Sequence, residues 1–145
     1  MCNVIAITNQ KGGVGKTTTA INLATSLVAT RKRVLLIDFD PQGNATTGSG
    51  VTLNPEMPTA KEMLLGETPL QETIQQTAAG FDIVPSDRRL TVAEVKLLQM
   101  QQREYLLKQI LFAVHSGYDY IFIDCPPGLN ELAVNALIAA SSVLV

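Results

Sequence analysis

The amino-acid sequence predicts an α/β fold in which a mostly parallel sheet carries helices on both faces. Short runs of apolar, often β-branched residues alternate along the chain with longer segments in which apolar residues recur at helical spacing. A glycine-rich turn separates the first apolar run from the first helical segment, which is where Rossmann-like sheets bind phosphate groups. Right-handed crossovers between successive strands would then distribute the helices over both faces.

Strands are expected where an apolar run is short and ends at a polar or turn-forming residue. Residues 3–8 form a β-branched run before the glycine-rich turn, and residues 34–37 form a continuous apolar run that ends at Asp38. Such a continuous run is typical of a strand that is covered on both faces. The same pattern predicts further strands at residues 81–84, 120–123 and 143–145.

Helices are expected where apolar residues recur every three to four positions. The first helix follows the glycine-rich turn and extends from residue 16 to about residue 31. The other helices are expected at residues 59–65, 90–100, 103–116 and 129–140. The segment 41–58 is rich in Gly, Asn, Thr and Pro and is predicted to be a loop.

The composition is that of a folded domain and excludes several functional classes. Of the 145 residues, 46% are hydrophobic and 17% are charged, which excludes intrinsic disorder. The net charge of −2 gives no general attraction to nucleic acid or to anionic lipid. The longest nearly apolar run, residues 136–145, is too short to cross a membrane, and the N-terminus lacks the basic region of a signal peptide. The two cysteines lie far apart and fit free thiols in the cytoplasm, where we expect the protein.

The strongest functional signal is a glycine-rich segment between the first strand and the first helix. Its sequence is Lys11-Gly12-Gly13-Val14-Gly15-Lys16-Thr17-Thr18. Glycines let the backbone fold tightly, so that successive N–H groups point at phosphate oxygens, and the positive end of the helix dipole adds to the attraction. Lys16 is expected to contact the β- and γ-phosphates, Thr17 a magnesium ion and Thr18 the α-phosphate.

The glycine-rich segment has two other possible interpretations, a turn without a ligand and a dinucleotide-binding turn. The usual phosphate-loop pattern begins with a glycine six residues before the lysine, where this chain has Gln10, so a glycine-rich turn without a ligand is one alternative. A dinucleotide-binding fold is the other, because Asp38 follows at about the spacing of a ribose-binding acid. That fold has a small residue where this chain has Thr18, and it has no use for a Lys-Thr pair, so a phosphate loop is favoured.

Acidic residues follow two other predicted strands, at the edge where open α/β sheets bind ligands. Asp124 comes directly after residues 120–123, which is the Walker B arrangement of an aspartate that binds Mg²⁺. Asp38 and Asp40 follow the second strand, and the alternation of side chains along a strand directs both carboxylates to the same side. One is expected to orient the attacking water and the other to support the metal, although strand-end aspartates also cap turns.

These motifs resemble the ParA/MinD family of P-loop ATPases, whose deviant Walker A motif reads Lys-Gly-Gly-x-x-Gly-Lys-Thr/Ser. The ParA/Soj branch is the most similar, over residues 9–18, 38–44 and 124–127. The resemblance implies catalytic roles for Lys11, Lys16 and Asp40. Lys11 would be the signature lysine that reaches the partner's phosphates in an ATP-sandwich dimer, and Asp40 would position the hydrolytic water. The metal residues would be Thr17, Asp124 and, indirectly, Asp38.

The resemblance also implies a function, namely a Mg²⁺-ATP-dependent ATPase that partitions chromosomes or plasmids. A homodimer with ATP, a ParB-like partner protein and non-specific DNA would be its partners, with no membrane, and the full-length protein would associate with the nucleoid. Members of the family are longer, and the last predicted strand here ends at Val145 without a helix to cover it. Residues 1–145 are therefore expected to be the N-terminal part of a single P-loop ATPase domain, truncated at its C-terminus.

Two alternative functions remain open at this point. A MinD-like positioning ATPase carries its membrane-targeting helix at the C-terminus, which this sequence does not test, although the segment 40–44 favours ParA. A truncated, non-hydrolysing nucleotide-binding module is the other alternative. One local departure concerns switch II, because Gly128-Leu129-Asn130 stands where the family usually has Ser-Leu-Gly.

Overall fold

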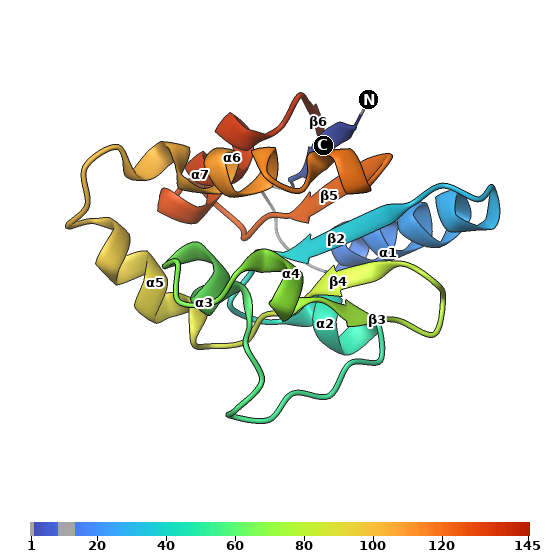
Figure 1. Cartoon of the computed structure of the whole chain (residues 1–145), viewed down its shortest axis with the longest axis horizontal. Coiled ribbons are helices and arrows are strands. Elements are labelled where there is room, and N and C mark those ends of the chain that lie inside the picture. Colours follow the sequence, from blue (N-terminus) through green and yellow to red (C-terminus); the bar gives the residue numbers. More distant parts are fainter. Residues whose placement is uncertain (1, 9–13) are drawn as a thin grey trace.

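The computed structural model describes residues 2–8 and 14–145, which form a six-stranded sheet between two layers of helices (Figure 1). The sheet has the strand order β3-β4-β2-β5-β1-β6. Its strands are β1 (Asn3–Ile7), β2 (Val34–Asp38), β3 (Gln75–Gln76), β4 (Asp82–Val84), β5 (Tyr120–Asp124) and β6 (Ser142–Leu144). All neighbours are parallel except β3, which pairs antiparallel with β4 at one edge. The predicted fold class is therefore confirmed.

Seven α-helices connect the strands in the part of the chain that the structure describes. They are α1 (Val14–Ala29), α2 (Asn44–Gly48), α3 (Ala60–Leu64), α4 (Leu70–Thr73), α5 (Leu90–Leu97), α6 (Leu106–Phe112) and α7 (Glu131–Ala139). Two 3₁₀ turns, η1 (Arg103–Tyr105) and η2 (His115–Gly117), flank α6.

The region predicted as one helix at 103–116 is thus divided into three pieces. The segment 41–58, predicted to be a loop, contains the short helix α2, and neither α4 nor β3 was expected from the sequence.

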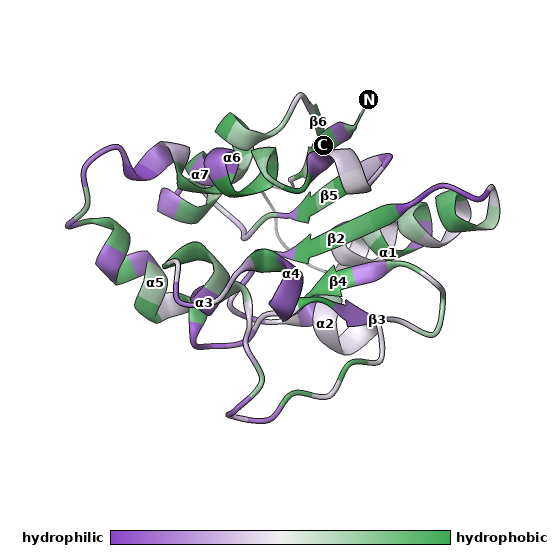
Figure 2. Ribbon diagram, in the orientation of Figure 1, coloured by the Kyte–Doolittle hydropathy of each residue, from purple (hydrophilic) through white to green (hydrophobic). Residues whose placement is uncertain are grey.

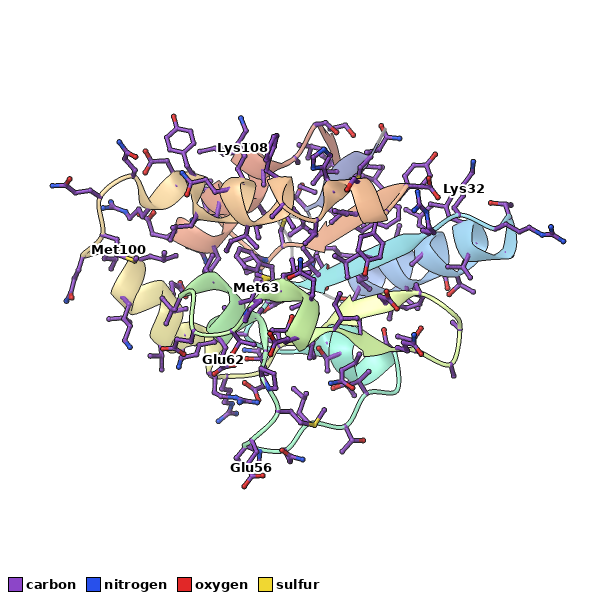
Figure 3. All side chains as sticks on the ribbon, viewed as in Figure 1. Lys32, Glu56, Glu62, Met63, Met100 and Lys108 are labelled. Carbon is purple, nitrogen blue, oxygen red and sulfur yellow. The ribbon has the colours of Figure 1, made fainter. Side chains whose placement is uncertain are left out.

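The alternation of side chains along the central strands supplies two hydrophobic cores, one on each face of the sheet. Leu35 and Ile37 of β2 belong to a core with residues of α3, α5, α6 and α7. Leu36 between them belongs to the opposite core, with residues of α1 and α2. Figure 2 shows the central strands as apolar, which fits strands that are covered on both faces. In Figure 3, Met63 of α3 lies within the fold, whereas Lys108 projects from α6.

The register of the parallel strands decides which residues meet at the functional edge. Asp124, the last residue of β5, pairs with Asp38 of β2 on one side and with Ile7 of β1 on the other. Helix α1 follows β1 in the sequence, and Lys16 and Thr17 near its start contact Asp124, so α1 begins beside these strand ends. The carboxyl ends of β1, β5 and β2 therefore bring the phosphate-loop segment, Asp124 and Asp38 to one place.

Candidate nucleotide-binding site

The first turn of α1 carries the described part of the predicted phosphate loop. Gly15, Lys16, Thr17 and Thr18 all lie in this turn, which opens the 16-residue helix Val14–Ala29. Unpaired N–H groups at such a helix start, together with the helix dipole, favour a bound phosphate. Lys11, Gly12 and Gly13 lie outside the described residues, as does the side chain of Val14, so their predicted contacts stay predictions.

Lys16 and Thr17 converge on Asp124, the predicted Walker B aspartate. The Lys16 ammonium forms a buried ion pair with Oδ1 of Asp124, and the side chains are 3% and 0% exposed. The Thr17 hydroxyl donates a hydrogen bond of 3.1 Å to Oδ2 of the same carboxylate. Since lysine is seldom buried without a partner, this pair places a cation and a carboxylate at one point of the sheet edge.

Asp38 lies beside this group and is completely buried. Its Oδ2 accepts hydrogen bonds from the Thr46 backbone N–H at 2.9 Å and from the Thr46 hydroxyl at 2.6 Å. Its Oδ1 accepts a bond of 3.2 Å from the backbone N–H of Asp40. Burial raises the pKa of Asp38 to about 7, and the charge of Asp124 adds to this shift, while the bonds from Thr46 oppose it. Both oxygens are engaged by the protein, which fits the predicted indirect role toward a metal.

Asp40 lies in a tight turn beyond the end of β2 and is 5% exposed. Its Oδ1 accepts a hydrogen bond of 3.0 Å from the backbone N–H of Gln42, and its carbonyl accepts one of 2.9 Å from Gly43. The carboxylate therefore does cap a turn, as strand-end aspartates often do. It also lies close enough to the other acids for its charge to act on Asp124, which fits the predicted convergence of the three carboxylates.

Two residues at this edge were not expected from the sequence, Thr46 of α2 and Ser86 after β4. Thr46 donates to Asp38, and its hydroxyl accepts a bond of 2.8 Å from the backbone N–H of Ser86. The Ser86 hydroxyl in turn donates to the carbonyl of Asp40 at 3.0 Å. Serine and threonine in polar segments are common, so nothing in the sequence alone distinguished these two from surface residues.

The oxygen atoms at this edge suit a magnesium ion that is also bound by a ligand. Within residues 2–8 and 14–145, no three His, Cys, Asp or Glu side chains gather into a group that would hold a metal by themselves. Mg²⁺ usually binds proteins through one or two carboxylates and completes its shell with waters and substrate phosphates. The Thr17 hydroxyl and the Asp124 carboxylate, 3.1 Å apart, are hard oxygen ligands of this kind. The residues therefore fit magnesium that arrives together with a phosphate ligand.

Open space adjoins the site on two sides of the start of α1. A cavity of about 430 Å³ lies between α1 and α2, and its lining is rich in hydroxyl and amide groups: Thr17, Thr18, Ile21, Asn22, Asn44, Thr47 and Gly48. A smaller cavity of about 160 Å³ is lined by Gly15, Lys16 and Thr19 of α1, with residues from the ends of β1 and β6. The predicted nucleotide-binding residues of α1 thus face accessible space.

Two further residues, Cys125 and His115, have structural roles. Burial raises the pKa of Cys125 to about 12, so its thiol stays protonated at neutral pH and behaves as a core residue. His115 contacts the carbonyl of Phe112 through Nδ1 at 2.5 Å, just beyond α6, as expected of a residue that caps a helix end. No helix within the described residues has the length and hydropathy needed to cross a membrane.

A parallel α/β sheet with a lysine and a threonine at the start of the first helix, opposite a strand-end aspartate, defines a P-loop nucleotide-binding protein. The chain matches the AAA domain family AAA_31 over residues 2–145. It therefore belongs to this family, and it is similar in sequence to curated ParA and Soj proteins.

Two curated relatives and one solved structure illustrate this similarity. The chromosome partitioning protein ParA of Caulobacter vibrioides is 49% identical over 145 residues, which cover 98% of this chain and 54% of that protein. The sporulation initiation inhibitor protein Soj of Bacillus subtilis is 46% identical over 146 residues, which cover 100% and 58%. Cobyrinic acid a,c-diamide synthase from Mycobacterium smegmatis, with a bound ATP analog and magnesium, superposes with a TM-score of 0.95 at 38% identity, covering 99% of this chain and 59% of that chain. The chain thus spans a little over half the length of these relatives.

Proposed function

We propose that this chain is the nucleotide-binding part of a Mg²⁺-ATP-dependent partitioning ATPase of the ParA/Soj type. The observation that carries the proposal is the buried convergence of Lys16 and Thr17 on Asp124 at the carboxyl edge of the sheet. The same synthase from M. smegmatis has been solved with an ATP analog and with ADP, each time with magnesium. The curated relatives with 46–49% identity carry the names ParA and Soj, which supports partitioning as the process served.

In this proposal the residues of the loop and of α1 bind the phosphates. The backbone N–H groups of residues 12–18 surround the phosphate oxygens, with the dipole of α1 behind them. Lys16 exchanges the Asp124 carboxylate for the β- and γ-phosphate oxygens, because its ammonium is already directed to the strand end. Thr18 donates to the α-phosphate. Lys11, which the structure does not describe, contacts the phosphates of a partner subunit.

Thr17 and Asp124 would hold the magnesium ion once Lys16 has moved to the phosphates. Bound Mg²⁺ supplies charge neutralisation at the β- and γ-phosphate oxygens. Asp38 supports this group through its position beside Asp124 in the sheet register. Its carboxylate oxygens are engaged by Thr46 and Asp40, so it acts on the site by charge and by positioning these neighbours.

Asp40 would orient the water that attacks the γ-phosphate. Its carboxylate lies beyond the strand end and keeps its position through the turn that Gln42 and Gly43 complete. A group that orients a nucleophile acts mainly in the transition state and contributes to turnover more than to affinity. Hydrolysis would then reset an ATP-driven dimer that associates with non-specific DNA on the nucleoid and responds to a ParB-like partner. The part of the relatives beyond this chain would supply the DNA-binding residues and the adenine contacts.

The alternatives are distinguished by different measurements. A MinD-like protein would bind lipid vesicles in the presence of ATP, and a non-hydrolysing module would bind ATP without steady-state release of phosphate. An ATP-dependent amide synthase, as the M. smegmatis structure is named, would consume ATP only with its acid substrate. Partitioning is favoured over that activity because the curated ParA relatives are more similar in sequence than the synthase is.

Calorimetry of ATP binding tests the proposal most directly. Lys16→Ala should abolish detectable binding of Mg²⁺-ATP, because the phosphates lose their main charge partner. Lys108→Ala is the matched control, since Lys108 is an exposed lysine of α6 and should leave the affinity unchanged. Unchanged affinity of the Lys16→Ala variant would show that this edge of the sheet is not a phosphate-binding site.

A further inference from the structure

Asp40 is held at both ends of its backbone by side chains from other positions in the fold. Its N–H donates to Oδ1 of Asp38 on β2 at 3.2 Å. Its carbonyl accepts a hydrogen bond of 3.0 Å from the hydroxyl of Ser86, which lies 46 positions further along the chain and follows β4. The bonds from Gln42 and Gly43 lie within the turn and move with it, so the contact with Ser86 is the one that ties the turn to another strand.

Ser86 also reaches Asp38, through Thr46. The backbone N–H of Ser86 donates to the Thr46 hydroxyl at 2.8 Å, and this hydroxyl donates onward to Oδ2 of Asp38 at 2.6 Å. All members of this chain of bonds are 5% exposed or less. Such buried and fully bonded polar networks hold their members in one arrangement, because any member that moves leaves a partner without a bond.

The turn and Ser86 also meet by direct packing of their backbones. Gly43 has a φ of +69°, and a Cβ atom at this position would lie 2.7 Å from the carbonyl oxygen of Ser86. A side chain there would force the two segments apart. The close approach therefore depends on a glycine at position 43 of the turn.

We propose that Ser86 and Thr46 are positioning residues that fix Asp40 and Asp38 over the nucleotide site. This inference rests on the proposed ATPase function. It adds two residues to the site that lie outside the phosphate-loop and Walker B motifs. The parallel pairing of β4 with β2 places Ser86 at the same sheet edge as Asp38 and holds it there independently of the turn. The bond from Ser86 fixes the position of the turn that carries Asp40 relative to the ends of the strands. A group that orients water has to be held in a fixed position of this kind.

Three variants of the full-length protein test this role. Ser86→Ala removes the hydroxyl that bonds Asp40, and Thr46→Val removes the hydroxyl that joins Asp38 to Ser86 at nearly constant volume. Ser86→Ala removes one neutral hydrogen bond and should lower kcat about threefold to tenfold. Thr46→Val removes two bonds, one of them to a carboxyl group, and should lower kcat by at least as much. ATP affinity should stay within about twofold in both variants. Thr46→Ser keeps the hydroxyl and should restore most of the turnover. A structural role alone would not produce this recovery together with unchanged affinity.

The control is Ser49→Ala, at the end of α2. Among the described residues the Ser49 hydroxyl is buried without a hydrogen-bond partner, so this change removes a hydroxyl outside the network and should leave kcat unchanged. Thermal unfolding of each variant shows whether it folds. Adding Ser86→Ala to an Asp40→Ala background should lower the residual single-turnover rate by less than twofold, because Ser86 acts through Asp40.

The outcomes separate this inference from the proposed function. Normal kcat in both Ser86→Ala and Thr46→Val, in a protein whose turnover depends on Asp40, would overturn the positioning role and leave the ATPase assignment in place. An undiminished effect of Ser86→Ala in the Asp40→Ala background would overturn it as well. If Asp40→Ala itself retains full turnover, the proposed role of Asp40 fails first, and the inference about Ser86 fails with it.

Discussion

Replacing Lys16 by alanine should reduce the stability of the protein as well as its affinity for ATP. The Lys16 and Asp124 side chains are 3% and 0% exposed, so their ion pair is shielded from solvent. Removing one partner of such a pair leaves an uncompensated buried charge, which costs about 3–5 kcal/mol. Asp124 keeps its bond from Thr17, so we expect a loss near the lower end, about 3 kcal/mol in the free energy of unfolding.

The stability that Lys16→Ala loses should depend on pH, because the ion pair with Lys16 affects the pKa of Asp124. Burial raises the pKa of Asp124, and the charge of Lys16 opposes this shift. Without Lys16 the pKa of Asp124 rises further, so the folded variant holds a proton that the unfolded chain releases near pH 4. A raised carboxyl pKa stabilises the folded state at low pH, and this contribution disappears as the pH rises through the folded-state pKa. The variant should therefore be closer to the parent at pH 5 than at pH 8.

Urea denaturation at pH 5 and pH 8, without nucleotide and with a chelator present, measures this effect. At pH 8 the free energy of unfolding of Lys16→Ala should fall by about 3 kcal/mol. In thermal unfolding at the same pH its melting temperature should fall by roughly 6–12 °C, given ~2–4 °C per kcal/mol for a domain of this size. A second change, Asp124→Asn, removes the orphaned charge and should recover most of the loss. If Lys16→Ala is as stable as the Lys108→Ala control at pH 8, the buried ion pair does not exist in solution and this reasoning is refuted.

Three further changes address catalysis, dimerisation and the fold. Asp40→Ala should still bind ATP in calorimetry but lose most steady-state phosphate release, because a group that orients water acts in the transition state. If the variant turns over ATP as fast as the parent, Asp40 only caps the turn. Lys11→Ala should bind ATP as a monomer but fail to dimerise, and a stable ATP-dependent dimer of the variant in light scattering would exclude the cross-subunit role. Arg31→Gly should raise the free energy of unfolding by about 0.5–1 kcal/mol in urea denaturation. Arg31 lies two residues after the end of α1 and has a φ of 65°, a conformation that glycine adopts without strain; lower stability of the variant would contradict this account of the helix end.

Most of the sheet could be predicted because its strands are short, apolar and buried on both faces. The runs that became β2 and β5 each end at the aspartate that the structure places at the functional edge, Asp38 and Asp124. The register between these strands then follows from their parallel pairing. The convergence of Lys16, Thr17 and Asp124 was accessible from the sequence for the same reason, since all parallel strands present their carboxyl ends on one side.

The elements that the sequence did not predict are those that depend on tertiary contacts. Helix α2 has only five residues, and apart from Ala45 they are asparagine, threonine and glycine, which have low helix propensity. It is held by the bonds from Thr46 to Asp38 and by the burial of Ala45. Strand β3 is only Gln75–Gln76 and forms by pairing with β4. The helix expected at 103–116 is α-helical only over Leu106–Phe112, and the 3₁₀ turns η1 and η2 form its two ends. The spacing of apolar residues along the sequence does not reveal these tertiary contacts.

The balance of charge at the sheet edge gives a physical reason for the coupling of nucleotide and metal. Asp38, Asp40 and Asp124 are each 5% exposed or less, and among the described residues Lys16 forms an ion pair with Asp124. Burial raises the pKa of Asp38 to about 7, and the negative charge of Asp124 adds to this shift. A triphosphate would add further negative charge and would draw Lys16 away from Asp124. The site can accept it only with additional cations, and in the proposed function Mg²⁺ at Thr17 and Asp124, with Lys11 from the partner, supplies them. Dimerisation and metal binding would thus follow from the same excess of buried carboxylates that holds the lysine in place.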